Sequence, residues 1–235
     1  MWYKLKRIMM RPNGVEKQVR PSRWQPWANT IAYYPLDSTN TINDLSWNSY
    51  NLTNSSISFG TYQWVDCAYN FGYNKWLYTS SWYSFTLHDY TFGAWFYKDD
   101  SWNSTFRRIV WPYEYAYLIY NKNTGRLWVN NADTDAKSIV TTYDRTRWNF
   151  FLITFDSSTS TDKMYLNWEL KTTFVDNEWT QRFNWRSWVA IWCNKASDSY
   201  DYWGWWISNV VIEDKVWTDQ EIASYYNSTK WNYWL

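Results

Sequence analysis

The sequence predicts an all-β domain of antiparallel strands, arranged as a sandwich or barrel and closed by one short helix. From Thr30 onward, β-branched and aromatic runs alternate with clusters of Asn, Asp and Ser, at the spacing of roughly 8–12 residues that is typical of such folds. No regular alternation of strand and helix occurs, which argues against a parallel α/β enzyme. Aromatic residues make up 24% of the 235 residues, and a chain with so much ring surface to bury is not disordered.

Each expected strand is a run of β-branched or aromatic residues that ends at turn-forming residues. The expected strands are Thr30–Leu36, Ser56–Phe59, Cys67–Phe71, Trp76–Thr79, Tyr90–Tyr97, Phe106–Val110, Tyr113–Tyr120, Arg126–Val129, Ser138–Thr142, Trp148–Phe155, Lys163–Leu166, Lys171–Val175, Val189–Ile191 and Trp206–Ile212. No stretch reaches the length of about 18 apolar residues that a membrane-spanning helix needs.

The helix is expected at Asp219–Asn227, where its start is well signalled. Thr218 and Glu221 have the spacing of a capping box, in which each side chain bonds the backbone N–H of the other residue. Trp217 and Ile222 stand where a hydrophobic staple closes over the first turn.

The charge distribution separates an N-terminal arm, residues 1–27, from the domain at 28–230 and a tail at 231–235. Residues 1–23 carry seven basic side chains and one acidic one, so the remainder has 16 basic and 21 acidic groups of the totals of 23 and 22. A basic arm suits either nucleic acid or solvent, and we favour the solvated arm and expect no nucleic-acid partner. The apolar stretch Ile8–Met10 is too short for a signal peptide.

The order of the segments resembles the LamG-like jelly roll of the concanavalin A-like lectin/glucanase superfamily over about residues 30–227. This resemblance implies an antiparallel jelly-roll β-sandwich with a C-terminal helix, in a superfamily that includes sugar-binding proteins and glucanases. The matching stretches are Ile31–Asp37, Asn43–Asn48, Cys67–Phe71, Tyr90–Tyr97, Arg147–Phe150, Met164–Leu170, Ile207–Ile212 and the helix at Thr218–Tyr226.

Tryptophan stands at several positions where that family has glycine, namely Trp47, Trp168, Trp192 and Trp205. The chain has 23 Trp but only 6 Gly, whereas average usage predicts roughly 16 Gly. Asn167 and Trp168 are expected to form a two-residue hairpin loop, in which Asn-Gly is preferred because both residues need a positive φ. One hypothesis is that the UGA codon, decoded as Gly in the source, has been read as Trp. The alternative is that the rings are genuine and contact sugars or a membrane interface.

Ten tryptophans are suspected glycine positions, several of them because they stand in a polar turn cluster or at a glycine position of the family pattern. They are Trp24, Trp47, Trp64, Trp102, Trp111, Trp168, Trp188, Trp192, Trp205 and Trp234. Restoring ten glycines brings the Gly count to the expected figure. UGG codons at Trp47 and Trp168 would exclude the hypothesis.

Catalytic residues are not expected. His88 is the single histidine, which excludes a His-based metal site within the chain, and no nucleophile elbow accompanies it. Retaining glucanases of the superfamily carry Glu-x-Asp-x-x-Glu on one strand, and this chain lacks that motif. The adjacent acids at 99–100 and 213–214 point to opposite faces if they lie on strands. Cys67 and Cys193 either pair or stay free.

Binding is the better supported activity, because sugars stack their apolar faces on aromatic rings and bond to polar side chains at the ring edges. Tyr113, Tyr115 and Tyr117 alternate and share one face of a strand. That face is either an open stacking platform or part of the core, and burial preferences favour the core. The second candidate site is the loop at 194–202, with Asp198, Tyr200 and Asp201.

The resemblance also implies a structural Ca²⁺, with Asp37, Asp44 and Asn48 as the nearest ligands, although such residues more often make turns. The sequence therefore predicts a non-catalytic carbohydrate-binding or adhesion module of a cell-surface, extracellular or virion protein, such as a tail fibre. Its partner would be a glycan or a surface protein. The alternatives are a protein-binding domain without sugar binding and, less favoured, a glycoside hydrolase.

Overall fold

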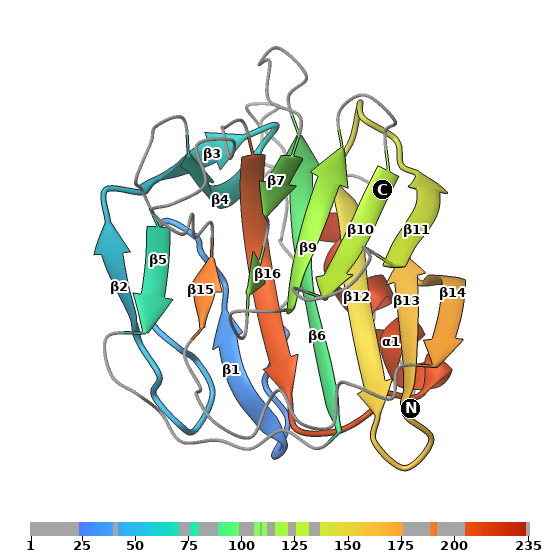
Figure 1. Cartoon of the computed structure of the whole chain (residues 1–235). Helices are drawn as coiled ribbons and strands as arrows, with labels where there is room; N and C mark the ends of the chain where they lie inside the picture. The colour runs from blue at the N-terminus through green and yellow to red at the C-terminus, as the bar shows by residue number, and fades with distance from the viewer. Residues whose placement is uncertain are drawn as a thin grey trace, which may run out of the picture.

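The computed structural model describes most of the domain as two layers of antiparallel strands and one helix (Figure 1). Between residues 106 and 142 it describes backbone only. The described residues are 24–39, 42–70, 76–79, 89–98, 106–108, 110–111, 116–121, 126–131, 137–175, 189–191 and 205–233.

One layer is an eight-stranded sheet in which all strand pairs are antiparallel. The central strand β16 pairs with β4 through its first residues and with β1 through its last ones. It also pairs with β6, so it has three partner strands. The order across the sheet is β14 (Glu169–Val175), β13 (Thr161–Leu166), β12 (Asn149–Asp156), β6 (Tyr90–Lys98), β16 (Trp205–Glu213), β4 (Val65–Asn70) and β3 (Ser58–Tyr62), with β1 (Thr30–Tyr34) beside β16.

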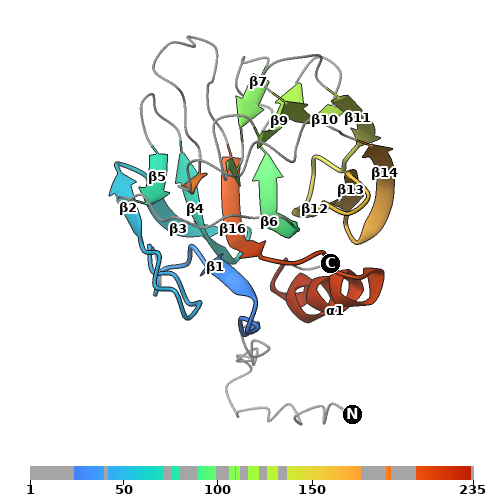
Figure 2. The ribbon, with the colours of Figure 1, turned by 60° about the horizontal axis from the view of Figure 1, so that its bottom comes forward.

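The second layer consists of two smaller sheets, which cover one face of the large sheet (Figures 1 and 2). Figure 2 shows α1 on the opposite side of the large sheet. One small sheet has the order β11 (Lys137–Thr142), β10 (Arg126–Asn131), β9 (Ala116–Asn121) and β7 (Phe106–Arg108). The other has the order β2 (Leu52–Ser55), β5 (Trp76–Thr79), β15 (Ala190–Ile191) and β8 (Val110–Trp111). The predicted antiparallel sandwich is confirmed.

Two hydrophobic cores lie on the two faces of the large sheet. Strand β6 shows how one sequence serves both, because successive side chains of a strand point to opposite faces. Phe92 and Phe96 enter the inner core between the layers, whereas Trp95 and Tyr97 enter the outer core beneath α1. The large sheet is therefore stabilised by apolar burial on both sides.

Helix α1 (Asp219–Thr229) begins as the sequence predicts. Thr218 accepts a hydrogen bond from the Glu221 backbone N–H, and the Glu221 carboxylate accepts one from the Thr218 N–H at 2.9 Å. Trp217 and Ile222 are both buried in the outer core. The helix runs two residues beyond the predicted end at Asn227, because Tyr225, Tyr226 and the following turn still pack on the sheet.

Both ends of the domain extend further than predicted. Residues 230–233, whose last three were assigned to a tail, form a 3₁₀-helix, η2 (Lys230–Tyr233), and the Tyr233 ring stacks on Trp95 at 3.9 Å between centroids. In the predicted arm, Trp24 is buried against Tyr33 and Tyr225, with centroid distances of 4.9 and 5.0 Å. Aromatic packing therefore draws both ends onto the outer core. Residues 1–23 lie outside the described part.

The short strands β2 and β3 were not both predicted from the sequence pattern. The chain between 52 and 62 forms β2 and β3, whereas the pattern predicted a single strand at 56–59. Strand β2 has the sequence Leu-Thr-Asn-Ser, whose polar residues resemble a turn cluster. Its strand conformation comes from pairing with β5, which is a tertiary contact.

Two hairpins of the large sheet turn through a pair of residues with positive φ. Asn167 and Trp168 join β13 to β14 with φ of 50° and 71°, and Gln63 and Trp64 join β3 to β4 with φ of 45° and 66°. Positive φ at both positions is the mark of a type I′ turn, whose second residue is ordinarily Gly. The predicted backbone requirement at Trp168 is confirmed, and Trp64 meets the same requirement.

Other suspected glycine positions have ordinary backbones or real packing roles. Trp47 is not among the described residues with positive φ, so its backbone conformation does not itself require Gly, and its place among the glycine positions stays a prediction. Trp24 fills the outer core as a ring. Trp111 and Trp205 lie within β8 and β16, where extended backbone suits any residue. Trp102, Trp188, Trp192 and Trp234 lie outside the described residues.

Glycine and alanine substitutions at these turns test the backbone strain, since both remove the ring and differ only in backbone freedom. We expect W64G to be more stable than W64A, and W168G more stable than W168A, by about 1 kcal/mol each. At Trp47 the order should reverse, because Gly adds entropy to the unfolded chain without relieving strain. Urea unfolding of the six variants measures these differences. Equal stability of Gly and Ala at 64 and 168 would contradict the turn assignment.

Candidate functional site

The tyrosines and the loop that the sequence proposed for sugar binding lie mostly beyond the described residues. Tyr117 is in β9, where its backbone pairs with Asn130. Tyr113 and Tyr115, and likewise Asp198, Tyr200 and Asp201, fall outside the described part. Their role in binding stays a prediction.

The predicted calcium ligands surround the loop that follows β1. The Asp44 carboxylate accepts hydrogen bonds from the backbone N–H groups of Tyr33, Ser46 and Tyr50 at 2.8–2.9 Å, and from the Ser46 hydroxyl at 2.7 Å. Asn48 donates to the carbonyl oxygen of Ile31 at 3.0 Å. Both residues tie the loop to β1.

These contacts leave little capacity for a cation. Asp37 uses one oxygen for the Thr39 backbone N–H and hydroxyl, the pattern of an Asx turn. Each Asp44 oxygen already accepts two hydrogen bonds from the chain. Within the described ranges, no group of three His, Cys, Asp or Glu is placed to hold a metal ion. The donors present thus fit a loop-organising role better than a calcium site, which stays a prediction.

A row of aromatic rings crosses the outer face of the large sheet near β3. We call Tyr69, Trp206, Tyr97 and Trp148 the aromatic row. Tyr69, Trp206 and Tyr97 occupy adjacent strands, because Trp206 pairs in register with Tyr69 on one side and with Tyr97 on the other, and Trp148 directly precedes β12. Ring centroids lie 5.5 Å apart between Tyr97 and Trp206 and 6.1 Å apart between Tyr97 and Trp148. Cross-strand aromatic pairs of this kind stabilise a sheet.

Tyr62 of β3 covers this row at the edge of the sheet. Its ring stacks on Trp206 with 3.9 Å between centroids and 21° between planes, and lies 4.7 Å from Tyr97. Trp206 is only 6% exposed, whereas Tyr62 is half-buried. The row is therefore buried in the middle of the outer face, and Tyr62, which covers its β3 end, is partly exposed to solvent.

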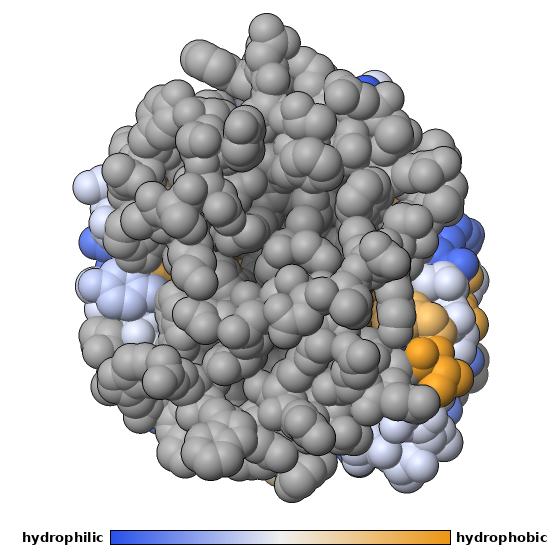
Figure 3. Space-filling view, in the orientation of Figure 1, coloured by the Kyte–Doolittle hydropathy of each residue, from blue (hydrophilic) through white to orange (hydrophobic). Residues whose placement is uncertain are grey.

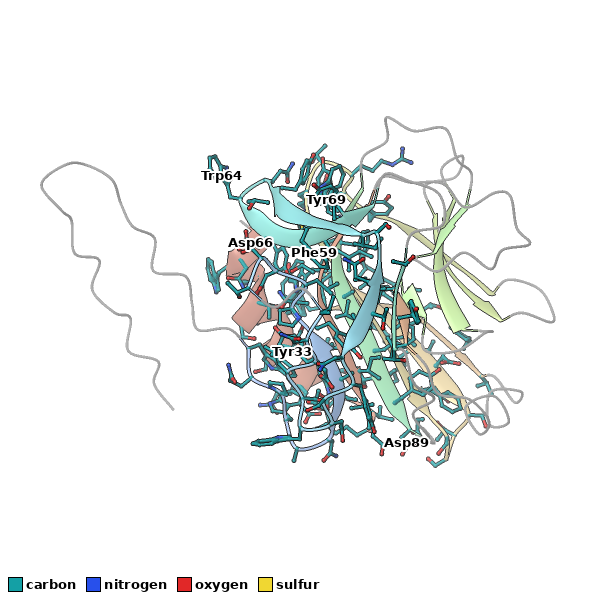
Figure 4. The ribbon with its side chains drawn as sticks, turned by 90° about the vertical axis from the view of Figure 1, so that its left-hand side faces the viewer. Tyr33, Phe59, Trp64, Asp66, Tyr69 and Asp89 are labelled. Carbon is teal, nitrogen blue, oxygen red and sulfur yellow. The ribbon has the colours of Figure 1, made fainter. Side chains whose placement is uncertain are left out.

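The β3–β4 hairpin presents further aromatic surface beside Tyr62. Figure 4 shows Trp64 at the hairpin tip, pointing away from the domain, and Tyr69 farther along the hairpin. The half-buried Tyr69 ring lies over Gly60, where an added Cβ would be 3.2 Å from the Tyr69 Cε1 atom. Gly60 therefore lets the ring lie against the strand.

This aromatic surface is not among the sites that the sequence predicts. The sequence signal for this surface is the alternation of Gly60 and Tyr62 before the turn at Gln63-Trp64. These residues indicate a hairpin only if Trp64 is taken as a glycine position. On its other face the hairpin is polar near the tip, because the Thr61 hydroxyl donates to Asp66 at 2.8 Å and Ser38 reaches the same carboxylate. Farther along that face, Phe59 packs against the inner core, whereas Tyr62 and Tyr69 lie on the outer side.

A second apolar surface lies at the opposite edge of the sheet. Leu170 and Val175 of β14 are exposed, and Figure 3 shows apolar atoms at the right-hand side, where β14 lies in Figure 1. Lys171 and Glu169 form an ion pair on the same strand. Charged residues on an edge strand oppose pairing with another chain.

The adjacent acids Glu213 and Asp214 do not form a catalytic pair. Glu213 is buried at the end of β16, whereas the adjacent Asp214 is exposed, so the two carboxylates lie in different environments. Hydrolysis of a glycoside needs two carboxylates facing one bond. The acids at 99–100 and His88 lie outside the described part. Cys67 is a free, buried thiol whose pKa is raised to about 12 by desolvation, which keeps it protonated and unreactive.

Glu213 is the buried carboxyl group of the outer core. It accepts a hydrogen bond from the Thr30 hydroxyl, which itself accepts one from the Trp27 N–H at 2.8 Å. Desolvation raises the pKa of Glu213 to about 7, against the lowering effects of the Thr30 hydrogen bond and Lys215. Lys215 also pairs with Glu221 of the capping box. The carboxyl group thus connects the N-terminal segment, β1 and the start of α1.

No protein-family model and no curated protein sequence matches this chain. Solved structures with the same fold are similar over most of it. The binding domain of Paraclostridial Mosquitocidal Protein 1 has a TM-score of 0.67 and 14% identity, and the match covers 85% of this chain and 52% of that one. Botulinum neurotoxin type C has a TM-score of 0.60 and 18% identity, covering 85% and 51%. The binding domain of botulinum neurotoxin DC has a TM-score of 0.61 and 16% identity, covering 86% and 52%.

These likenesses establish the fold as a β-sandwich of the kind found in those binding domains. The chain spans about half the length of the proteins that it matches. They do not single out the LamG-like family, so that resemblance stays a prediction. Among the described helices, none has the length and apolar character required to cross a membrane.

Replacing Glu213 tests its burial through the pH dependence of stability. The folded-state pKa of about 7 lies above the unfolded value of 4.5, so the folded protein holds this proton more tightly. The contribution of Glu213 protonation to the free energy of unfolding is complete below pH 4.5. It is lost as the pH rises to 7, and the total loss is about 3 kcal/mol.

We expect E213Q to lack this decline when free energies of unfolding are measured across that range. E169Q is the control, because the Lys171 contact lowers the pKa of the exposed Glu169 and leaves the neutral range unaffected. A wild-type curve parallel to that of E213Q would refute the assignment.

Proposed function

We propose that the chain is a non-catalytic carbohydrate-binding or adhesion module of a cell-surface, extracellular or virion protein. The observation that carries this proposal is the aromatic surface at β3, where Tyr62 lies flat over the aromatic row and remains partly open to solvent. Aromatic rings of this kind bind the apolar faces of sugars, and hydroxyl and amide groups bind their edges. A glycan or a surface protein is the proposed partner.

The structural neighbours support a binding role. Botulinum neurotoxin type C interacts with two ganglioside molecules, and the botulinum neurotoxin DC binding domain has been solved with SialylT. These facts belong to those proteins, of which the present chain matches about half. They support the proposal by showing that the fold occurs in binding domains that recognise sugars.

A protein-binding domain without sugar binding is the second candidate. Its support is the botulinum neurotoxin DC binding domain in complex with rat synaptotagmin II. The exposed Leu170 and Val175 on β14 offer an apolar edge for such a partner. A glycoside hydrolase is the third and least supported alternative, since the sequence lacks the Glu-x-Asp-x-x-Glu motif and the adjacent Glu213 and Asp214 lie in different environments.

We also propose that the suspected tryptophans include true glycine positions, Trp64 and Trp168 foremost. Their positive φ values support this, and their side chains are 78% and 50% exposed, so neither ring is needed for the core. Trp24 is withdrawn from the proposal because its ring packs in the outer core. Sugar binding should therefore be assigned to aromatic rings that pack on the sheet and not to Trp64 or Trp168.

Calcium at Asp37, Asp44 and Asn48 is a separate proposal, derived from the resemblance alone. If the ion is structural, adding EDTA lowers the thermal unfolding midpoint and excess Ca²⁺ restores it, because binding to the folded state alone stabilises that state. The D44A variant should then show no response to either addition. A parent protein that is indifferent to EDTA and Ca²⁺ removes the proposal.

A glycan array combined with a reducing-sugar assay separates the three functions. The proposal expects retention of defined glycans with no release of reducing ends. Release of reducing sugar would identify a hydrolase. Silence in both assays would refute sugar binding and favour the protein-binding domain.

A further inference from the structure

Residues 24–29 precede β1 and form a segment that we call the N-terminal strap. The strap contains neither strand nor helix and lies on the outer core through two aromatic rings. Trp24 is buried, with its ring centroid 5.0 Å from that of Tyr225. Trp27 is half-buried, with its centroid 5.0 Å from that of Trp217. The strap is therefore held by side-chain packing, and it can open without the separation of any strand pair.

The Glu213 side chain lies where the strap joins β1. It is fully buried, and one of its oxygens accepts a hydrogen bond from the Thr30 hydroxyl. The same hydroxyl accepts a hydrogen bond from the Trp27 backbone N–H at 2.8 Å, so it links the carboxyl group to the strap. The other oxygen, Oε2, is buried without a hydrogen-bond partner within the described part. An ionised carboxylate in this position would be poorly stabilised.

The charges around Glu213 offer it little compensation. The strap and β1 carry no charged side chain, and β6 places the uncharged Thr91 opposite Glu213. The titratable residues on the elements packed around it are Tyr33 of β1, Asp214 and Lys215 after β16, and Glu221 and Tyr225 of α1. Burial raises the pKa of Tyr225 well above its ordinary value, so this residue stays neutral. Lys215 forms its ion pair with Glu221, and its Nζ lies 4.9 Å from the centroid of the Trp27 ring.

We propose that Glu213 and the N-terminal strap form a pH-dependent switch, in which the strap is closed while the carboxyl group is protonated and opens when it ionises. On ionisation Glu213 releases its proton to solvent and leaves a negative charge in the buried site. Opening of residues 24–29 moves Trp27 away from Thr30 and admits water to the carboxylate, while the strands of the large sheet stay paired. The switch belongs to the outer core and does not depend on the proposed function.

The pKa of Glu213 sets the pH range of this opening. Desolvation raises that pKa to about 7 from the ordinary value of 4.5, against the lowering effects of Thr30, Trp217 and Lys215. Because water restores the ordinary pKa when the strap is open, the opening equilibrium is constant below pH 4.5, rises up to the folded-state pKa and levels off above it. The increase is about 300-fold across the whole range.

Native-state hydrogen exchange of the whole chain, followed by NMR at several urea concentrations between pH 5 and 7, tests the proposal. Rates are converted to protection factors, which removes the intrinsic effect of pH on exchange. The reporters are the amides of Trp27 and Asp214, which donate to Thr30 and to Asn29. We expect their protection factors to fall about 40-fold over this pH range and to depend little on urea, because opening of the strap exposes little surface. The amides of β12 should depend steeply on urea, because their exchange requires unfolding of the sheet.

Two variants identify the group that titrates. E213Q keeps an acceptor for the Thr30 hydroxyl but cannot ionise, so its strap amides should show no fall in protection with pH. E221Q is the matched control, because it removes one negative charge from the same cluster and Gln also completes a capping box. Its strap amides should still lose protection as the pH rises. Near-UV circular dichroism checks that both variants are folded.

Two results would overturn the proposal. Equal urea dependence of the strap amides and the β12 amides would show that Glu213 acts on global unfolding alone and that the strap does not open by itself. A fall in protection of the E213Q strap that equals that of the parent would show that another group governs the opening. Neither result bears on sugar binding, which the glycan array tests separately.

Discussion

Burial of the large sheet on both faces is the constraint on which the other features of this protein depend. A sheet with one face covered can leave polar side chains on the other face, but β6 and β16 carry apolar residues on both. The inner face is covered by the smaller sheets. The outer face requires α1, η2 and the segment that contains Trp24 and Trp27, because exposed rings there would lose the free energy of apolar burial.

Aromatic rings make this outer layer possible. Trp95 packs between Phe150, Tyr226 and Tyr233, at centroid distances of 5.3, 5.4 and 3.9 Å, and its indole N–H donates to Thr229 at 3.0 Å. One residue of β6 thus holds both α1 and η2 on the sheet. The same layer ends at β3, where Tyr62 is the last ring and remains partly exposed. The candidate binding surface is therefore the rim of a core, and its rigidity derives from that core.

Tryptophan has opposite roles at different positions of this chain. Trp95 and Trp217 are fully buried, whereas Trp64 and Trp168 are exposed at backbone positions that disfavour any large L-residue. A count of aromatic residues cannot separate these two groups. Backbone φ separates them, because strain at a turn does not depend on what the side chain contacts.

Local patterns in the sequence determined the strand class, most strand positions and the start of α1. Alternation and turn residues act over a few neighbours, so the strand at Tyr90–Tyr97 and the Thr218–Glu221 capping box were predictable without a structure, and β6 extends that strand by one residue. The Asn167-Trp168 turn was predictable for the same reason. Only the tertiary structure decided that β2 is a strand, that the segments at 24–27 and 230–233 pack on the sheet, and that Tyr62 lies over Trp206. These features depend on contacts between residues far apart in the chain, and no local pattern specifies such contacts.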